Sequence, residues 1–146
     1  MPATIPIHAK DLMTTTVVTL SGNQTLEHIE EAMKLLRFRH MPVVEGDRII
    51  GLVTLRDALR VSASSLIPNA NAQDRFLEGQ FKVADVMKRE LTTVAPDTPL
   101  TEVAKLLLDQ KVGCTPVVED QNVLIGIITE ADFVKLAIEL QARLLG

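Results

Sequence analysis

The sequence has no tryptophan or tyrosine, and its 146 residues include only four phenylalanines and one cysteine. Proteins that hold unpaired nucleic-acid strands stack the bases on aromatic side chains, which this chain largely lacks. With Cys114 as the only cysteine, an internal disulfide is excluded, and this usage fits a reducing compartment. No apolar run approaches the roughly 18 residues of a membrane span, and no secretory signal is visible at the N-terminus. We therefore expect a cytoplasmic protein without a membrane segment.

Motifs for catalysis and metal binding are also missing. The sequence contains no G-x-S-x-G nucleophile motif and no glycine-rich phosphate loop. Its three histidines, His8, His28 and His40, do not cluster with acidic residues or with the cysteine at the spacing of metal ligands. We therefore expect neither an enzyme nor a metal protein.

The net charge is −4 and is unevenly distributed. Residues 1–73 carry seven Lys or Arg and seven Asp or Glu, whereas residues 74–146 carry eight and twelve. An acidic total argues against general nucleic-acid binding, which needs a broad basic surface. The first half nevertheless has a local excess of cations, which fits either a solvated surface or a site for one small anion. This local excess lies within residues 34–60 and comprises Lys34, Arg37, Arg39, Arg48, Arg56 and Arg60, set against Glu45, Asp47 and Asp57.

The chain contains an internal repeat. "GLVTLRD" at residues 51–57 recurs as "GIITEAD" at residues 126–132, and "PVVE" occurs twice. An offset of 74 residues aligns the earlier parts of the copies, and one extra residue after "EDQN" raises the offset to 75. We place this insertion at the polar tip of a hairpin, where changes in length cost little. Two copies cover nearly everything outside residues 62–80, which is strong evidence of duplication.

Each copy predicts the same order of elements: strand, helix, strand, strand, helix. Short β-branched strands are expected at 17–20 and 91–94, strands of the hairpins at 41–45, 48–54, 115–119 and 123–129, and helices after each first and third strand. In the first long helix, the apolar face comprises Leu26, Ile29, Met33 and Leu36, and the second copy repeats it with Leu100, Val103 and Leu107. Thr98 is expected to cap that second helix, with Pro99 as its first residue.

The fold class that follows is α/β (α+β), with two pseudo-symmetric βαββα repeats packed sheet to sheet in one module. A single unit of about 55 residues would be marginally stable, so the two copies should share a core. We predict repeat 1 at residues 8–61, a linker at 62–80 with one helical turn near 74–78, and repeat 2 at 81–140, with its last helix extended to 146. The apolar stripe of that helix fits either a core face or a partner surface; it comprises Phe133, Leu136, Ala137, Leu140 and Leu144.

This arrangement resembles a tandem pair of cystathionine-β-synthase (CBS) domains, also called a Bateman module. The likeness lies in the ordered set "DLM", "MPVVE" and "GLVTLRD", which returns as "DVM", "TPVVE" and "GIITEAD". It covers residues 8–61 and 82–140. The resemblance implies a regulatory sensor that binds an adenosine-containing ligand in clefts between the repeats.

The resemblance also implies which residues bind. The aspartate of T-x-x-D holds ribose hydroxyls and its threonine lies near phosphate, which names Thr54 with Asp57 and Thr129 with Asp132. A phosphate-binding cation is expected three residues before the strand proline, where Arg39 stands in the first copy. The base of the ligand would lie against Leu91, Thr92, Val112, Cys114 and Thr115 in the Asp57 cleft, and against Thr16, Val17, Phe38, His40 and Met41 in the Asp132 cleft.

The two predicted clefts differ in charge. Gly113 replaces the cation in the second copy, so the Asp57 cleft should prefer phosphate and the Asp132 cleft a less charged nucleoside such as S-adenosylmethionine, or no ligand. Each of the predicted ligand residues also has a purely structural explanation, which stays open. T-x-x-D is also a capping box, Arg39 fits a solvated side chain, His40 a packed histidine and Cys114 a small buried residue.

We therefore expect a regulatory module that binds an adenine nucleotide, namely AMP, ADP or ATP, and transmits the ligand state to a separate effector protein. A homodimer is the expected assembly. The alternatives are a ligand-free scaffold for protein contacts, S-adenosylmethionine binding, or nucleic-acid binding, which the charge disfavours.

Overall fold

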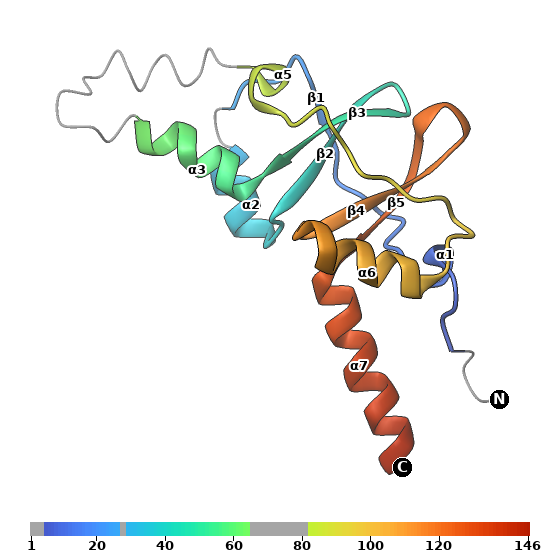
Figure 1. The fold of residues 1–146 in the computed structure, drawn as a ribbon. Coiled ribbons are helices and arrows are strands. Elements are labelled where there is room, and N and C mark those ends of the chain that lie inside the picture. The colour runs from blue at the N-terminus through green and yellow to red at the C-terminus, as the bar shows by residue number, and fades with distance from the viewer. Residues whose placement is uncertain (1–4, 27–28, 65–81) are drawn as a thin grey trace. The chain divides into compact units, whose positions relative to one another are not determined.

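The computed structural model describes residues 5–26, 29–64 and 82–146 (Figure 1). The chain divides into two compact units, one formed by Val18–Leu91 and the other by Met1–Val17 together with Thr92–Gly146. His28, residues 65–80 of the predicted linker and the helical turn predicted near 74–78 lie outside the described residues. The fold is mixed α/β, as predicted.

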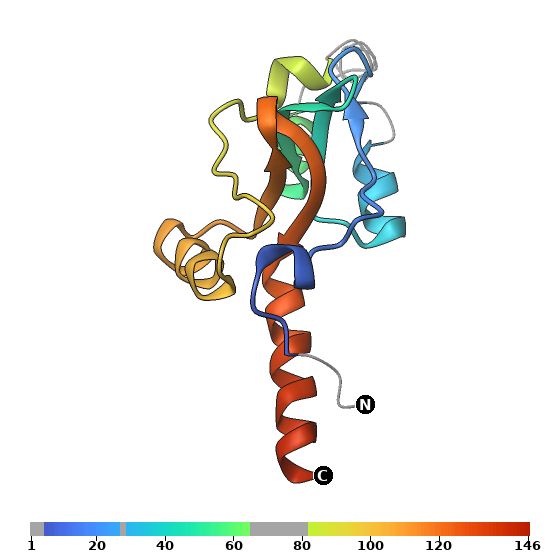
Figure 2. The ribbon, with the colours of Figure 1, turned by 90° about the vertical axis from the view of Figure 1, so that its right-hand side faces the viewer.

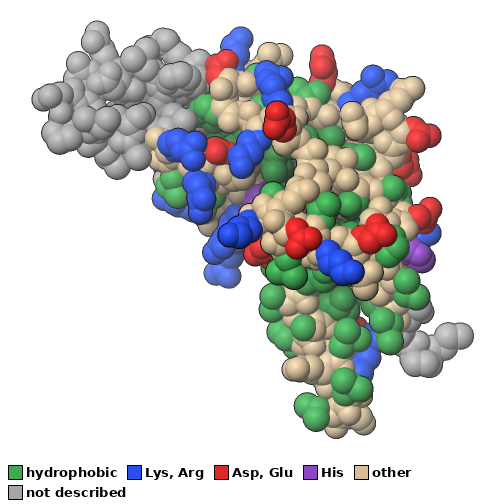
Figure 3. Space-filling view, in the orientation of Figure 1, with side chains coloured by type: hydrophobic (Ala, Val, Ile, Leu, Met, Phe, Trp, Pro, Cys, Tyr) green, Lys and Arg blue, Asp and Glu red, His purple; other side chains and the backbone are tan. Residues whose placement is uncertain are grey.

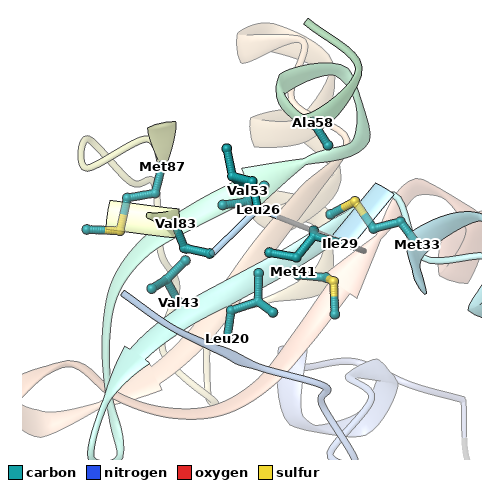
Figure 4. Packing of buried hydrophobic residues seen from close by; sticks show 10 residues of the cluster. All are labelled: Leu20, Leu26, Ile29, Met33, Met41, Val43, Val53, Ala58, Val83 and Met87. Carbon is teal, nitrogen blue, oxygen red and sulfur yellow. The ribbon is translucent and has the colours of Figure 1, made fainter. Parts of the chain in front are cut away.

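The unit formed by Val18–Leu91 contains a small sheet with helices packed on it. Its elements are β1 (Leu20–Ser21), α2 (Ile29–Leu36), β2 (His40–Glu45), β3 (Arg48–Thr54), α3 (Leu55–Ser64) and α5 (Val83–Val86). β1 runs parallel to β2, and β2 runs antiparallel to β3. The buried side chains from these elements form one core (Figure 4), which comprises Leu20, Leu26, Ile29, Met33, Met41, Val43, Val53, Ala58, Val83 and Met87.

The second unit repeats this design. Its elements are α1 (Ala9–Leu12), α6 (Leu100–Gln110), β4 (Cys114–Glu119), the 3₁₀ turn η1 (Asp120–Asn122), β5 (Val123–Thr129) and α7 (Glu130–Leu145). β4 and β5 pair antiparallel. The buried residues of its core are Ala9, Leu100, Val103, Val117 and Ile128.

Each unit is completed by a segment from the other sequence repeat. In the first unit, the Val83 amide donates to the Gln24 carbonyl at 2.8 Å, and Lys88 exchanges backbone hydrogen bonds with Leu52 at 2.9 and 3.0 Å. In the second unit, Thr14 exchanges the same pair of bonds with Ile127. The predicted repeats therefore describe the duplication in sequence, whereas the compact units exchange the short helices that precede the first strands.

The hairpins confirm the predicted strands and the position of the insertion. β3 and β5 span the ranges predicted for them, and both hairpins carry an irregularity at equivalent positions, after Val43 and after Val117. The first hairpin closes with Glu45 opposite Arg48, and the second closes with Glu119 opposite Val123. The extra residue of the second copy therefore lies in the turn, as expected.

The first strands are shorter than predicted. β1 contains only Leu20 and Ser21, and in the second copy Val94 alone forms an isolated bridge, with Val117. Both first strands pair where the chain runs beside the second strand of its own copy, and Leu20 lies opposite Val43. Val17, Val18 and Thr19, which were predicted as part of this strand, therefore lack a strand partner among the described residues.

Two helix predictions need correction. Leu36 was expected on the buried face but is 50 % exposed, because α2 ends there and Arg37 adopts the left-handed conformation with φ of 60°. Thr98 does not cap α6; its hydroxyl accepts a hydrogen bond from the Ala95 amide at 3.0 Å, and Pro99 takes the N-cap position.

The apolar stripe of α7 divides along its length. Phe133 and Leu136 pack against the core, whereas Leu144 is 85 % exposed. Figures 1 and 2 show the C-terminal turns of α7 extending away from the other elements of its unit. Among the described residues, no helix is long and apolar enough to cross a membrane.

Candidate functional site

The T-x-x-D motif of the first repeat forms a closed turn at the start of α3. The Thr54 amide and the Thr54 hydroxyl both donate to Oδ2 of Asp57, at 3.1 and 2.9 Å, and the Asp57 amide donates to the Thr54 hydroxyl oxygen at 3.2 Å. The capping-box reading is therefore correct for Thr54 and Asp57. This role fixes the carboxylate in one orientation.

The Thr54–Asp57 turn uses only one of the two carboxylate oxygens of Asp57. The side chain is buried, with 9 % exposure, and both bonds that its carboxylate accepts go to Oδ2. Within the described parts of the chain, no hydrogen bond to Oδ1 is found. A carboxylate oxygen in this state can accept a bond from a hydroxyl group, because an ionised carboxylate has about four acceptor positions.

Arg39 is placed beside this turn by the backbone. The Leu55 amide, the first of α3, donates to the Arg39 carbonyl at 2.8 Å, and His40, the next residue, lies opposite Thr54 in the sheet. The Arg39 side chain is exposed. The structure therefore brings together three predicted site residues, Thr54, Asp57 and Arg39, in one unit.

The second repeat builds the same turn with different charges. The Thr129 amide donates to Oδ2 of Asp132 at 2.8 Å, and the Glu130 amide donates to the Gly113 carbonyl at 3.1 Å. Asp132 is half-buried. Where the first turn has Arg39 beside it, this turn has only the backbone of Gly113. An anion would therefore find no cationic side chain at the equivalent position.

The predicted base contacts in the second unit are Thr92, Val112, Cys114, Thr115, Thr16 and Val17. Thr115 is fully buried, and its hydroxyl donates to the Thr92 carbonyl at 2.9 Å. Cys114 is also buried, and desolvation raises the pKa of its thiol to about 12. Val112 and Val17 are half-buried and Thr16 is exposed. The polar group of Thr115 is therefore satisfied inside the protein, and its ligand role stays a prediction.

The first unit holds the other predicted base contacts, Phe38, His40, Met41 and Leu91. Met41 is buried in the core of this unit, whereas Phe38 is 37 % exposed. His40 and Leu91 are half-buried. Contact of these side chains with a base likewise stays a prediction.

Sequence analysis placed Arg56 in the local excess of cations but did not name it as a site residue, and it missed one backbone contact. Arg56 stands inside the motif as its sixth letter, "GLVTLRD", and its side chain is exposed in the first turn of α3. The sequence difference that points to Arg56 is that the second copy has Ala131 at the equivalent position. No sequence pattern indicates the hydrogen bond from the Leu55 amide to the Arg39 carbonyl, because this bond depends on the pairing of β2 with β3.

The described acidic, histidine and cysteine side chains do not suggest a metal site. In residues 5–26, 29–64 and 82–146, no group of three His, Cys, Asp or Glu side chains is placed to hold a metal ion. The Thr54–Asp57 turn offers an acceptor for a hydroxyl group, and the backbone of Arg39 is held at the start of the same helix.

Solved structures of similar fold contain adenosine compounds. CBSX2 in complex with AMP has a TM-score of 0.76 and 23 % identity, and the match covers 93 % of this chain and 99 % of that chain. The cytosolic domain of the Mg²⁺ channel MgtE in complex with ATP has a TM-score of 0.69 and 25 % identity, over 89 % of this chain and 48 % of that chain. The CBS domain pair of MJ0100 in complex with 5′-methylthioadenosine and S-adenosyl-L-methionine has a TM-score of 0.70 and 23 % identity, over 90 % of this chain and 97 % of that chain. These likenesses show the shared fold, and the ligands are those of the three proteins.

Sequence comparison identifies the family. A profile of the CBS domain matches residues 9–64 and 83–139. The CBS domain-containing protein YhcV of Bacillus subtilis (strain 168) is 37 % identical over 124 residues, which cover 84 % of this chain and 80 % of YhcV. The structure of AcuB from Vibrio cholerae has 36 % identity and a TM-score of 0.78 over 93 % of each chain. The chain belongs to the CBS domain family and carries two CBS domains in tandem.

Proposed function

We propose that this chain is a non-catalytic regulatory module that binds an adenine nucleotide at Thr54, Asp57 and Arg39. CBS domain proteins are generally regulatory, and structural neighbours hold AMP, ATP or S-adenosylmethionine. The observation that carries the proposal is the 2.8 Å bond between the Leu55 amide and the Arg39 carbonyl. It fixes the backbone of Arg39 at the start of the helix that carries the buried Asp57 carboxylate.

Each group has a separate task in the proposed complex. Oδ1 of Asp57 accepts a hydrogen bond from a ribose hydroxyl, while Oδ2 stays in the turn with Thr54. Arg39 donates to phosphate oxygens, because a guanidinium matches the geometry of a phosphate group. A nucleotide satisfies both groups at once, whereas an uncharged nucleoside leaves Arg39 unused.

The Asp132 turn has a different ligand in this proposal. It retains the carboxylate but has Gly113 in place of the cation. A ribose with an uncharged or positively charged substituent suits such a turn better than a phosphate does. S-adenosylmethionine is the proposed ligand there, with an empty turn as the other outcome.

The test is calorimetric titration of the full chain with AMP, ADP, ATP and S-adenosylmethionine. We expect Asp57→Asn to weaken nucleotide binding by about tenfold, since the amide is a poorer acceptor for hydroxyl groups than a carboxylate. Asp85→Asn is the matched control: Asp85 accepts the Lys82 amide at 3.0 Å in a similar cap at the start of α5, outside the proposed site residues. It should lose comparable capping stability and keep its nucleotide affinity.

Two results would contradict the proposal. The first is the absence of heat and of a melting shift with every nucleotide, which would favour a ligand-free scaffold. The second is equal affinity in Asp57→Asn and the wild type, which would restrict Asp57 to helix capping.

Regulation requires a coupling between ligand and partner. In this proposal the chain is a cytoplasmic homodimer, and nucleotide binding favours one conformation that an effector protein recognises. The exposed apolar residues of α7 support the dimer: Val134 is 60 % and Ile138 is 65 % exposed. These two residues are four positions apart on one helical face, which suits contact with a second helix.

A further inference from the structure

A cluster of basic side chains covers one part of the first unit. Figure 3 shows Lys and Arg side chains gathered over α2 and α3. The exposed basic residues of these helices and of the segment that follows α2 are Lys34, Arg37, Arg39, Arg56 and Arg60. We call this set the basic cluster. Two of its members, Arg56 and Arg60, lie on α3, the helix that begins with the Thr54–Asp57 turn.

Three arginines of the basic cluster lie on α3 or at its start, and we call them the arginine track. Arg39 stands beside the start of α3, because its carbonyl accepts the Leu55 amide. Arg56 is the next residue of α3 after Leu55, and Arg60 lies four residues further on the same exposed side. Residues four apart in a helix have β-carbons about 5–6 Å apart. The arginine track therefore offers an anionic ligand more than one cation, two of them on one side of α3.

The positions of these arginines are unfavourable for α3 itself. Like charges four residues apart repel each other, and a cation in the first turn opposes the helix dipole. Over the ranges 5–26, 29–64 and 82–146, no ion pair is found for Arg39, Arg56 or Arg60. The acid closest in sequence to Arg56 and Arg60, Asp57, is buried and bonded to Thr54. An anionic ligand would relieve this repulsion.

The equivalent part of the second unit shows that the fold does not require these cations. Gly113 stands in place of Arg39, and Ala131 stands in place of Arg56. Only Lys135 retains a charge, in place of Arg60. The same backbone bond to the first helical amide is made in both units, at 2.8 and 3.1 Å. The track of three arginines is therefore a property of the first unit alone.

We infer that the ligand of the first unit carries a chain of two or more phosphates, and that Arg56 and Arg60 bind the phosphates beyond the one at Arg39. This inference rests on the proposed function, because it places the ribose at Asp57. Arg56 and Arg60 are then the residues that distinguish a nucleoside di- or triphosphate from a monophosphate.

The test compares AMP, ADP, ATP and inorganic tripolyphosphate by calorimetric titration of the full chain at fixed salt. The wild type should bind ATP at least about tenfold more tightly than AMP, since each exposed charge pair contributes up to about fivefold. The double variant Arg56→Gln, Arg60→Gln should lose about tenfold in ATP affinity and less than about twofold in AMP affinity. Lys135→Gln is the matched control and should leave both affinities unchanged.

The outcomes separate this inference from the proposed function. Equal affinity of the wild type for AMP and ATP, or an equal loss of both in the double variant, would overturn the inference while the proposed function stands. No binding of any nucleotide would overturn both. Binding of tripolyphosphate as tight as that of ATP would overturn the assignment to a nucleotide, because the phosphate chain alone would then account for the affinity.

Discussion

Met87 fills the space beside Gly51: its Cγ atom lies 2.7 Å from the point that a β-carbon on Gly51 would occupy. The second unit repeats this relationship with Met13 and Gly126, at 2.8 Å. In both cases the methionine ends a short helix and the glycine lies in the third strand of the other repeat. Each glycine is therefore needed for close approach of a side chain.

Gly51→Ala should destabilise the protein by about 1–3 kcal/mol, because the added methyl group overfills a packed site. Urea unfolding measures the change. Gly22→Ala is the control, since its β-carbon would meet Ala84 at 3.4 Å, an ordinary contact distance. In the double variant Gly51→Ala, Met87→Ala, the two costs should not add, because the residues share one space. Additive costs would contradict the packing described.

Thr115→Val should cost about 1–3 kcal/mol of stability, because it removes the donor that satisfies the Thr92 carbonyl while keeping the volume nearly unchanged. Urea unfolding again provides the measurement. Thr101→Val, at an exposed position of α6, is the control and should change stability little. A neutral Thr115→Val would mean that water replaces the hydroxyl.

Cys114 should make stability depend on pH in the alkaline range. Its pKa rises from the ordinary value of 9.0 to about 12 in the folded chain, because burial disfavours the thiolate. Above pH 9 the unfolded chain releases the thiol proton while the folded chain keeps it. The stabilising contribution is therefore complete below pH 9 and is lost progressively as the pH rises toward 12.

The comparison with Cys114→Ala isolates this effect. Between pH 7 and pH 10 the wild type should lose about 1.4 kcal/mol more stability than the variant, as the unfolded thiol ionises. Urea unfolding at both pH values measures the difference. An identical pH dependence in the two proteins would show that the thiol is accessible to solvent in the folded state.

Ile138→Glu should convert the proposed homodimer into a monomer, because a buried charge without a partner opposes helix contact. Light scattering after size-exclusion chromatography measures the mass in solution. Lys135→Glu, at a position of α7 that already carries a charge, is the control and should leave the mass unchanged. A wild-type monomer would contradict the proposed dimer.

The hairpins and the T-x-x-D turns were predictable from the sequence. Apolar runs bounded by polar turns fix the ends of β3 and β5 at Thr54 and Thr129. A threonine followed by an acid three positions later closes a cap through local hydrogen bonds, whatever the rest of the fold does.

The remaining features depend on contacts that the sequence does not encode locally. Both copies offer a methionine and a glycine, so sequence alone does not assign Met13 to Gly126 rather than to Gly51. The α2 and α6 helices end at Arg37 and Lys111 in the left-handed conformation, with φ of 60° and 52°, where glycine is the usual signal. The environment of Arg39 depends on a backbone bond to α3.

The exchange of short helices has a consequence for biosynthesis. Val18–Leu91 is one uninterrupted stretch and can fold as soon as it leaves the ribosome. The other unit must wait until Thr92–Gly146 has been translated, and only then can Met1–Val17 dock, after a long loop has closed. During this interval the N-terminal segment is without its partner, so the second unit should fold last and more slowly.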